Sequence, residues 1–181
     1  MRLGDQASRR WLARTLAWSS VVLLVLYGAA YLAGKSLGPM RRIGQTQGCM
    51  SNVRLLARAF ALYADDYEDR FPPASRWMDA SGPYVVKEQR FRCPAVMEAS
   101  GNAYGYAASR SLGGVMRAEL EAPGETRLLY DSTLLGRNAS DSAGSLPIPG
   151  RHVRRAGPNA PWRPANVVAY ADGGARLEWR P

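Results

Sequence analysis

A run of twenty residues without a charged side chain, Thr15 to Gly34, constrains this chain more than any other feature. At 1.5 Å per residue, a helix of this length spans about 30 Å, the thickness of the hydrocarbon core of a bilayer. Aromatic residues of the kind found at membrane surfaces lie toward its two ends: Trp11, Trp18, Tyr27 and Tyr31. The run therefore predicts one transmembrane helix.

Other interpretations of this segment stay open. A cleaved signal peptide would have a shorter apolar core, and the small residues around Ala29, Ala30 and Ala33 match its cleavage site only loosely. A lipoprotein anchor would need a cysteine close behind the run, whereas Cys49 lies well past it and Thr46 is not an aliphatic residue. A buried helix of a soluble protein would be shorter or more amphipathic.

Positive charge lies on both sides of the run. Residues 1–14 form a basic flank, and residues 35–48 form a connector that begins with a lysine and carries two arginines. The positive-inside rule is therefore indecisive about orientation. Within the connector, Gly38-Pro39 predicts either a break between two helices or a kink in one long helix.

The stretch that follows, residues 49–73, has the periodicity of a helix with one buried face. Apolar residues recur three and four apart, at Val53, Leu56, Phe60, Tyr63 and Tyr67. The stripe is widened by Leu55, Ala59 and Leu62, while Arg54 and Arg58 lie on the outward side. We therefore expect this helix to pack against another layer of the domain.

The helix should end just before Phe71-Pro72-Pro73, because the residue before a proline disfavours the helical conformation. Four acids gather near this end: Asp65, Asp66, Glu68 and Asp69. Since the helix dipole disfavours negative charge at a C-terminus, we expect the last turn to fray.

Short motifs in a fixed order continue along the chain. They are Cys49-x-Ser51-Asn52, then Tyr63, Asp66 and Tyr67, Phe71-Pro72, Phe91-Arg92-Cys93-Pro94, Tyr104-Gly105-Tyr106, the LLYDS of residues 128–132, Arg151-His152, and residues 166–173 with Asp172-Gly173. In this order they resemble type IV pilin-like proteins that carry a processing-associated domain named for a His-x9-Asp-Gly motif (DUF1559-like). These proteins are relatives of the type II secretion pseudopilins, and the resemblance covers residues 49–173.

The resemblance implies an α+β fold. A long N-terminal helix, transmembrane in its first half and amphipathic in its second, would pack on a small antiparallel β-sheet. Two departures qualify it. Pseudopilins carry a glutamate at the fifth position of the apolar helix, whereas this apolar run holds no acid, so we expect no cleavage by a prepilin peptidase. Nineteen residues, not nine, separate His152 from Asp172, and Gly174 stands where the family often has a histidine.

The chain has two cysteines, Cys49 and Cys93, forty-four residues apart. In an anchored protein, a pair is most simply one disulfide, which would need an oxidising compartment and would place the ectodomain outside the cytoplasm. Two separate buried thiols are the alternative. Two cysteines and the single histidine share no ligand spacing, so we expect no metal site.

Short apolar runs in the rest of the ectodomain, residues 49–181, predict strands at 84–86, 91–93, 126–131, 165–170 and 175–179. The last two flank Asp172-Gly173-Gly174, which predicts a hairpin because Asp-Gly supplies the positive φ of a tight turn. Alternation places Val168 and Tyr170 on one face of the sheet and Val167 and Ala169 on the other. Residues 137–150, rich in Ser, Gly and Pro, predict an exposed loop.

Nothing in the sequence indicates an active site or a cofactor. No serine or cysteine has a base nearby in sequence, no Gly-rich phosphate loop follows a strand, and His152 is expected to be a structural hydrogen-bonding residue. A calcium ion held by Asp131, Asp141 and Asp172 is a minor alternative to acids that cap turns.

These patterns favour a single-pass bacterial membrane protein with a periplasmic or extracellular ectodomain. By resemblance it would be a non-enzymatic component of a type II secretion or type IV pilus-like assembly, with the membrane and other pilin-like or secretion-machine subunits as partners. The alternatives are an adhesion or ligand-binding module that uses the 95–114 and 137–164 loops, and a DNA-capturing minor pilin. The latter would use Arg151, Arg154, Arg155 and Arg163. Despite the net charge of +9, we see no recognition helix or zinc-finger spacing and do not expect nucleic acid.

Overall fold

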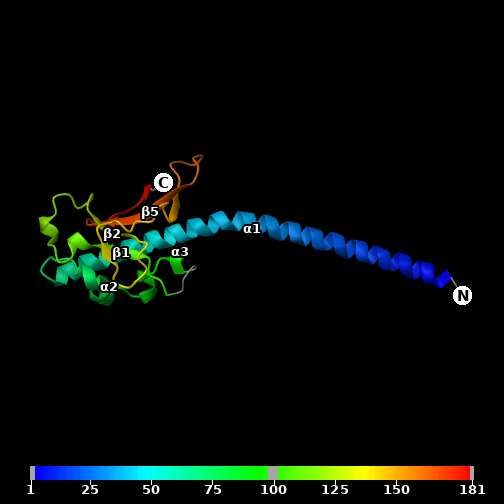
Figure 1. Cartoon of the computed structure of the whole chain (residues 1–181), viewed down its shortest axis with the longest axis horizontal. Coiled ribbons are helices and arrows are strands. Elements are labelled where there is room, and N and C mark those ends of the chain that lie inside the picture. Colours follow the sequence, from blue (N-terminus) through cyan, green and yellow to red (C-terminus); the bar gives the residue numbers. More distant parts are fainter. Residues whose placement is uncertain (1–2, 98–101, 180–181) are drawn as a thin grey trace. The chain divides into compact units, whose positions relative to one another are not determined.

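A computed structural model describes residues 3–97 and 102–179 of the chain. It is an α+β structure in which one long helix is followed by short helices and a small sheet (Figure 1). The chain divides into two units, residues 1–41 and residues 42–181. The helices are α1 (Leu3–Asp66), α2 (Trp77–Ser81) and α3 (Pro94–Met97), with 3-10 helices η1 (Ala74–Arg76), η2 (Gly82–Tyr84), η3 (Glu88–Phe91), η4 (Arg110–Leu112) and η5 (Arg117–Glu119). The strands are β1 (Tyr106–Ser109), β2 (Arg127–Asp131), β3 (Ser140–Asp141), β4 (His152–Arg154), β5 (Arg163–Tyr170) and β6 (Ala175–Trp179).

The first unit consists of the N-terminal part of α1. Its apolar residues are exposed, with Leu24 at 71%, Tyr27 at 73% and Leu32 at 67%. A window of 18 residues in this helix has a mean hydropathy of 1.8 and no buried residue, so the helix is long and apolar enough to cross a membrane. Of the basic flank predicted at 1–14, residues 1–2 lie outside the described residues.

Of the two alternatives at Gly38-Pro39, the break between two helices is excluded and the one long helix is confirmed, because α1 is helical without interruption from Leu3 to Asp66 and includes Pro39. The predicted connector, residues 35–48, is therefore part of this helix. A proline inside a helix removes one hydrogen bond and crowds one carbonyl. That local cost in free energy is smaller than the stabilisation from the helical hydrogen bonds on both sides of the proline. On the C-terminal side, burial of Cys49, Val53 and Leu56 in the core stabilises the helix further.

In the second unit, one face of α1 is buried as predicted. Val53, Leu56 and Phe60 are at most 2% exposed, and Ala59 is 1% exposed. The far end of the stripe is different, since Tyr63 is half-buried and Tyr67 is 53% exposed. Leu55 and Leu62 were predicted to widen the buried stripe, but they are 43% and 40% exposed because the core covers a narrower arc of the helix.

The sheet has six strands. Five of them follow the order β3-β1-β2-β5-β4, and the sixth, β6, also pairs with β5. Four strand pairs are antiparallel, as predicted, but β1 and β3 are parallel, so the sheet is mixed. The predicted hairpin is confirmed: β5 and β6 pair antiparallel, and Gly173 has a φ of 85° in the turn.

The two faces of β5 contact different clusters. Val167 and Ala169 pack with Val53, Leu56 and Phe60 of α1, whereas Val168 and Tyr170 pack with Tyr130, Ala107 and Leu146 on the other face. This is the alternation that the sequence predicted. Figure 1 shows the C-terminal part of α1 running beside β2 and β5, so the sheet covers the buried stripe of the helix.

Two predicted strands do not form. Residues 84–86 begin with the last residue of η2, and residues 91–93 begin with the last residue of η3. Phe91 and Cys93 are buried against α1, so their apolar character reflects contact with the helix and not membership in the sheet. Conversely, β1, β3 and β4 were missed. The 95–114 loop contains β1, while the predicted 137–150 loop contains β3 and the buried Ser145 and Leu146.

Candidate functional site

A buried polar cluster joins segments that are far apart in the sequence. It consists of Cys49 on α1, Cys93 before α3, Tyr106 at the start of β1, Asp131 at the end of β2 and His152 at the start of β4. Each of these residues is at most 3% exposed. Such a set of polar groups in a core is costly unless its members bond to one another, which makes this cluster the most informative site in the domain.

The two cysteines are in direct contact. Their Sγ atoms are 2.8 Å apart, and both side chains are fully buried as thiols. The prediction that they lie together is confirmed. The disulfide itself stays a prediction, and two adjacent cysteines are placed to form one.

His152 and Asp131 form a buried ion pair behind the sulfurs. The Nε2 atom of His152 is 3.3 Å from Oδ1 of Asp131 and 3.7 Å from Sγ of Cys93. The other carboxylate oxygen, Oδ2, accepts a hydrogen bond of 2.6 Å from the backbone N–H of Val167. Arg151 adds a second positive charge, since its Nη1 atom is 3.5 Å from Oδ1 of Asp131.

Arg151 also forms hydrogen bonds to the segments before β1 and after β2, which lie next to the cluster. Its guanidinium donates hydrogen bonds to the carbonyl oxygens of Gly105 and Ser132, at 2.8 and 2.5 Å. Gly105 has a φ of 82°, and a Cβ at this position would lie 2.8 Å from Val96 and 3.3 Å from the Cβ of Cys93. The Tyr104-Gly105-Tyr106 motif therefore needs its glycine for close approach to the cysteine segment.

The cluster separates the pKa values of its members. Burial by itself lowers the pKa of His152, but the charge and hydrogen bond of Asp131 outweigh it and raise that pKa to about 9. The hydrogen bond from Cys49, followed by that from His152, lowers the pKa of the Cys93 thiol to about 5, whereas burial raises the pKa of Cys49. In the reduced cluster these shifts favour a protonated imidazole of His152 beside an ionised thiol of Cys93.

Two kinds of chemistry suit these donors. The side chains of Cys49, Cys93 and His152 offer ligand atoms within 4.8 Å of one another, a convergence that sequence spacing did not reveal because it joins three distant segments. Thiolates that share a tetrahedral zinc ion lie about 3.7 Å apart, as follows from a Zn–S distance of about 2.3 Å. The observed 2.8 Å is closer to a covalent pair, so the cluster suits a disulfide better than a metal ion.

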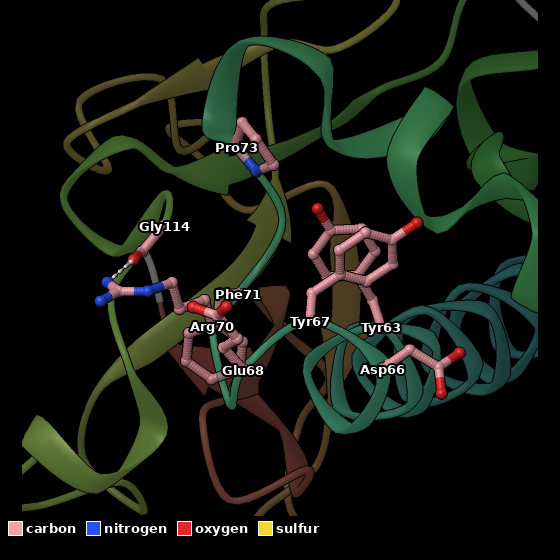
Figure 2. Close-up of a pocket in the computed structure, with 8 residues that line it drawn as sticks. All are labelled: Tyr63, Asp66, Tyr67, Glu68, Arg70, Phe71, Pro73 and Gly114. Atoms are coloured by element: carbon pink, nitrogen blue, oxygen red, sulfur yellow. Dashed lines mark hydrogen bonds between the residues drawn. The ribbon is translucent and has the colours of Figure 1, made fainter.

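A second site lies at the end of α1 and contains most of the helix motif. Tyr63, Asp66, Tyr67 and Phe71 line an open pocket of about 310 Å³. Figure 2 shows the rings of Tyr63 and Tyr67 overlapping, with centroids 4.2 Å apart and an angle of 8° between their planes. Asp66 accepts a hydrogen bond of 2.6 Å from the hydroxyl of Tyr84, whose ring meets Tyr63 edge-on.

The chain leaves this pocket through a backbone turn of unusual conformation. Glu68 and Asp69 have φ values of 54° and 62°, and the N–H of Asp69 bonds back to the carbonyl of Ala64 at 2.9 Å, as in a helix C-cap. Arg117 pairs with Asp65, at 2.7 Å, and with Asp69. The acidic end that was expected to fray is thus held by an arginine from η5, which the sequence did not single out.

The remaining predicted residues are dispersed. Pro72 is buried beside Phe71. His152 pairs with Ala165 near the start of β5, whereas Asp172 and Gly173 follow Tyr170 at its other end, so the two halves of the His–Asp-Gly motif are not brought together. Asp172 accepts the N–H of Gly174 at 2.8 Å, as a turn-capping residue does.

The three acids proposed for calcium have separate partners. Asp131 binds Val167 and His152, Asp141 accepts the hydroxyl of Tyr130 and the N–H of Ser145, and Asp172 caps its turn. Within residues 3–97 and 102–179, the one group of potential metal ligands that converges is the cysteine–histidine group. The acids therefore serve as local acceptors at strand ends and turns.

No protein-family model, curated protein or solved structure matches this chain. The resemblance to pilin-like proteins therefore stays a prediction from the sequence motifs. The structure shows an α+β fold with a long N-terminal helix and a small mixed sheet.

Proposed function

We propose that the chain is a membrane-anchored, non-catalytic structural component of a pilin-like envelope assembly of the type II secretion or type IV pilus kind. One observation carries this proposal: a single helix, α1, provides both an apolar segment long enough to cross a membrane and a buried stripe for the domain core. The same helix would anchor the domain and organise it. The ectodomain would lie in the periplasm or outside the cell, where Cys49 and Cys93 would pair.

The outward side of α1 offers a surface for lateral assembly. Leu55, Arg58 and Leu62 are exposed and recur at three and four residues, so they lie on one side of the helix, which we call the outer face. Because the fifth-position glutamate of pseudopilins is absent, contact with a neighbouring pilin-like subunit would use this face in place of a charge pair at the N-terminus.

Site-specific photo-crosslinking in intact cells tests the proposal. A photoreactive phenylalanine analogue in place of Leu55 or Leu62 should crosslink to other pilin-like or secretion-machine subunits. The same analogue at Arg110, an exposed position on η4, is the matched control and should not. The absence of adducts at Leu55 and Leu62, together with adducts from residues 137–164, would replace the assembly proposal with an adhesion module.

A further inference from the structure

An arginine-lined pocket lies beside the start of the second unit. It measures about 520 Å³ and includes Arg42 on α1, Arg151 and Arg163 in its lining, with Gln45, Trp162 and Pro164. No aspartate or glutamate is among the residues that line it. A pocket with guanidinium groups and no carboxylate attracts an anion.

The strands beside this pocket carry opposed positive charges. Arg154 on β4 and Arg163 on β5 are directly paired in the antiparallel register, and both lie over the ring of Trp179, at 5.1 and 5.9 Å. Like charges directly opposite one another destabilise a sheet. Within the described part of the chain, neither guanidinium forms an ion pair with a carboxylate, so an external anion would relieve the repulsion.

Two exposed apolar side chains lie in or next to the lining of this pocket. Trp162, which lines the pocket, is 44% exposed, and Ile148, next to the lining residue Pro149, is 74% exposed. Tryptophan beside arginine is typical of surfaces that meet the headgroup region of a membrane. The combination indicates an amphiphilic anion and not a fully hydrated one.

The pocket includes a residue close in sequence to the predicted membrane segment, which indicates a lipid as the source of that anion. Arg42, which lines the pocket, follows the end of the apolar run at Gly34 by only eight residues of the chain. We propose that Arg42 and Arg163 bind the phosphate of an anionic phospholipid headgroup, beside Trp162 in the lining of the pocket. This inference depends on the membrane anchoring proposed above, and it adds a lipid-binding site to it.

Three of the four arginines considered for DNA capture already donate hydrogen bonds to backbone carbonyls. Arg151 bonds to two backbone carbonyls, Arg154 donates to the carbonyl of Leu177 at 2.6 Å, and Arg155 donates to that of Ala160 at 2.8 Å. A strand of DNA needs a row of free cations along its phosphates. A single pocket with few free cations suits one headgroup phosphate better than a polynucleotide.

Native mass spectrometry of the detergent-solubilised full chain tests this site. The wild type should retain phosphatidylglycerol in preference to phosphatidylcholine. Arg42→Gln and Arg163→Gln should each reduce phosphatidylglycerol retention about fivefold, as expected for one cation near an anionic lipid surface, whereas Arg42→Lys should largely keep it. Arg54→Gln, on the exposed side of the same helix, and Arg110→Gln, on η4, are the matched controls and should have no effect.

Equal retention of the two lipids, or equal losses in the control variants, would overturn the proposal. Displacement of phosphatidylglycerol by a DNA oligonucleotide that binds in its place would also overturn it, in favour of DNA. Resistance of the chain to alkaline extraction from membranes is measured in parallel. If the chain stays in the membrane while lipid selectivity is absent, the headgroup site fails and the anchor stands.

Discussion

The buried His152–Asp131 pair makes the stability of the oxidised domain depend on alkaline pH. With free thiols, the folded-state pKa of His152 is about 9, against an ordinary value of 6.5, because Asp131, with smaller contributions from Cys93, outweighs the effect of burial. In the oxidised domain the contribution of Asp131 remains, so the pKa of His152 stays raised. A raised pKa contributes stability that is complete below 6.5 and is lost as the pH rises through 9. The loss amounts to about 1.4 kcal/mol per pH unit within the window, and to at most about 3 kcal/mol over the whole of it.

The same experiment distinguishes a disulfide from a thiol pair. In the reduced protein the pKa of Cys93 is lowered from 9.0 to about 5, so its ionisation stabilises the fold increasingly as the pH rises from 5 to 9. Between pH 6.5 and 9 the two slopes have opposite signs and nearly cancel. A disulfide removes the thiol, and then only the decline due to His152 remains.

Urea unfolding of the full chain in detergent, followed by tryptophan fluorescence at pH 6.5, 8 and 9.5, provides the measurement. We expect the oxidised wild type to lose at most about 3 kcal/mol, the reduced protein to change little, and His152→Gln to be flat in the oxidised state. A flat oxidised wild type, or a decline that persists in His152→Gln, would refute the reasoning.

Three further predictions concern packing and charge. Phe60→Ala should lower the free energy of unfolding by about 3–5 kcal/mol, because the ring is 2% exposed and packs on Phe71 and Trp77, whereas Leu62→Ala should cost less than about 1 kcal/mol in the same denaturation assay. Reductant should lower the free energy of unfolding by about 4 kcal/mol, because it breaks the predicted disulfide between Cys49 and Cys93, which are 44 residues apart. Cys93→Ser should make the free energy of unfolding insensitive to reductant. If the variant remains sensitive, the disulfide is excluded. Arg117→Gln should lower the free energy of unfolding by about 1 kcal/mol in thermal unfolding, because it removes the ion pairs with Asp65 and Asp69 at the end of α1. Arg110→Gln, at an exposed position, is the control. Equal effects of the two substitutions would show that these ion pairs do not stabilise the end of the helix.

The long helix, its buried stripe and the β5–β6 hairpin were predictable because each depends on local periodicity. Val53, Leu56 and Phe60 repeat at helical spacing, and Asp172-Gly173 marks a turn that few other dipeptides favour. The width of the buried stripe was not predictable, since Leu55 and Leu62 have the same apolarity as their buried neighbours. Whether such a residue is buried depends on how far the sheet extends around the helix.

The buried cluster was only partly predictable for a related reason. The pairing of Cys49 with Cys93 follows from their number, but no local pattern shows that His152 and Asp131 lie beside them. Strands β1, β3 and β4 have two to four residues and little alternation, so their assignment depends on their partners. The predicted strands at 84–86 and 91–93 failed in the opposite sense, because their apolar residues pack on α1.

Protease treatment of intact spheroplasts, combined with an alkaline wash of their membranes, tests most directly whether α1 anchors a domain on the oxidising side of the membrane. The chain should stay in the membrane after the wash, and residues 42–181 should be digested without lysis. Release of the chain by the wash, or protection of those residues until the cells are lysed, would contradict the anchored ectodomain and the assembly role proposed for it.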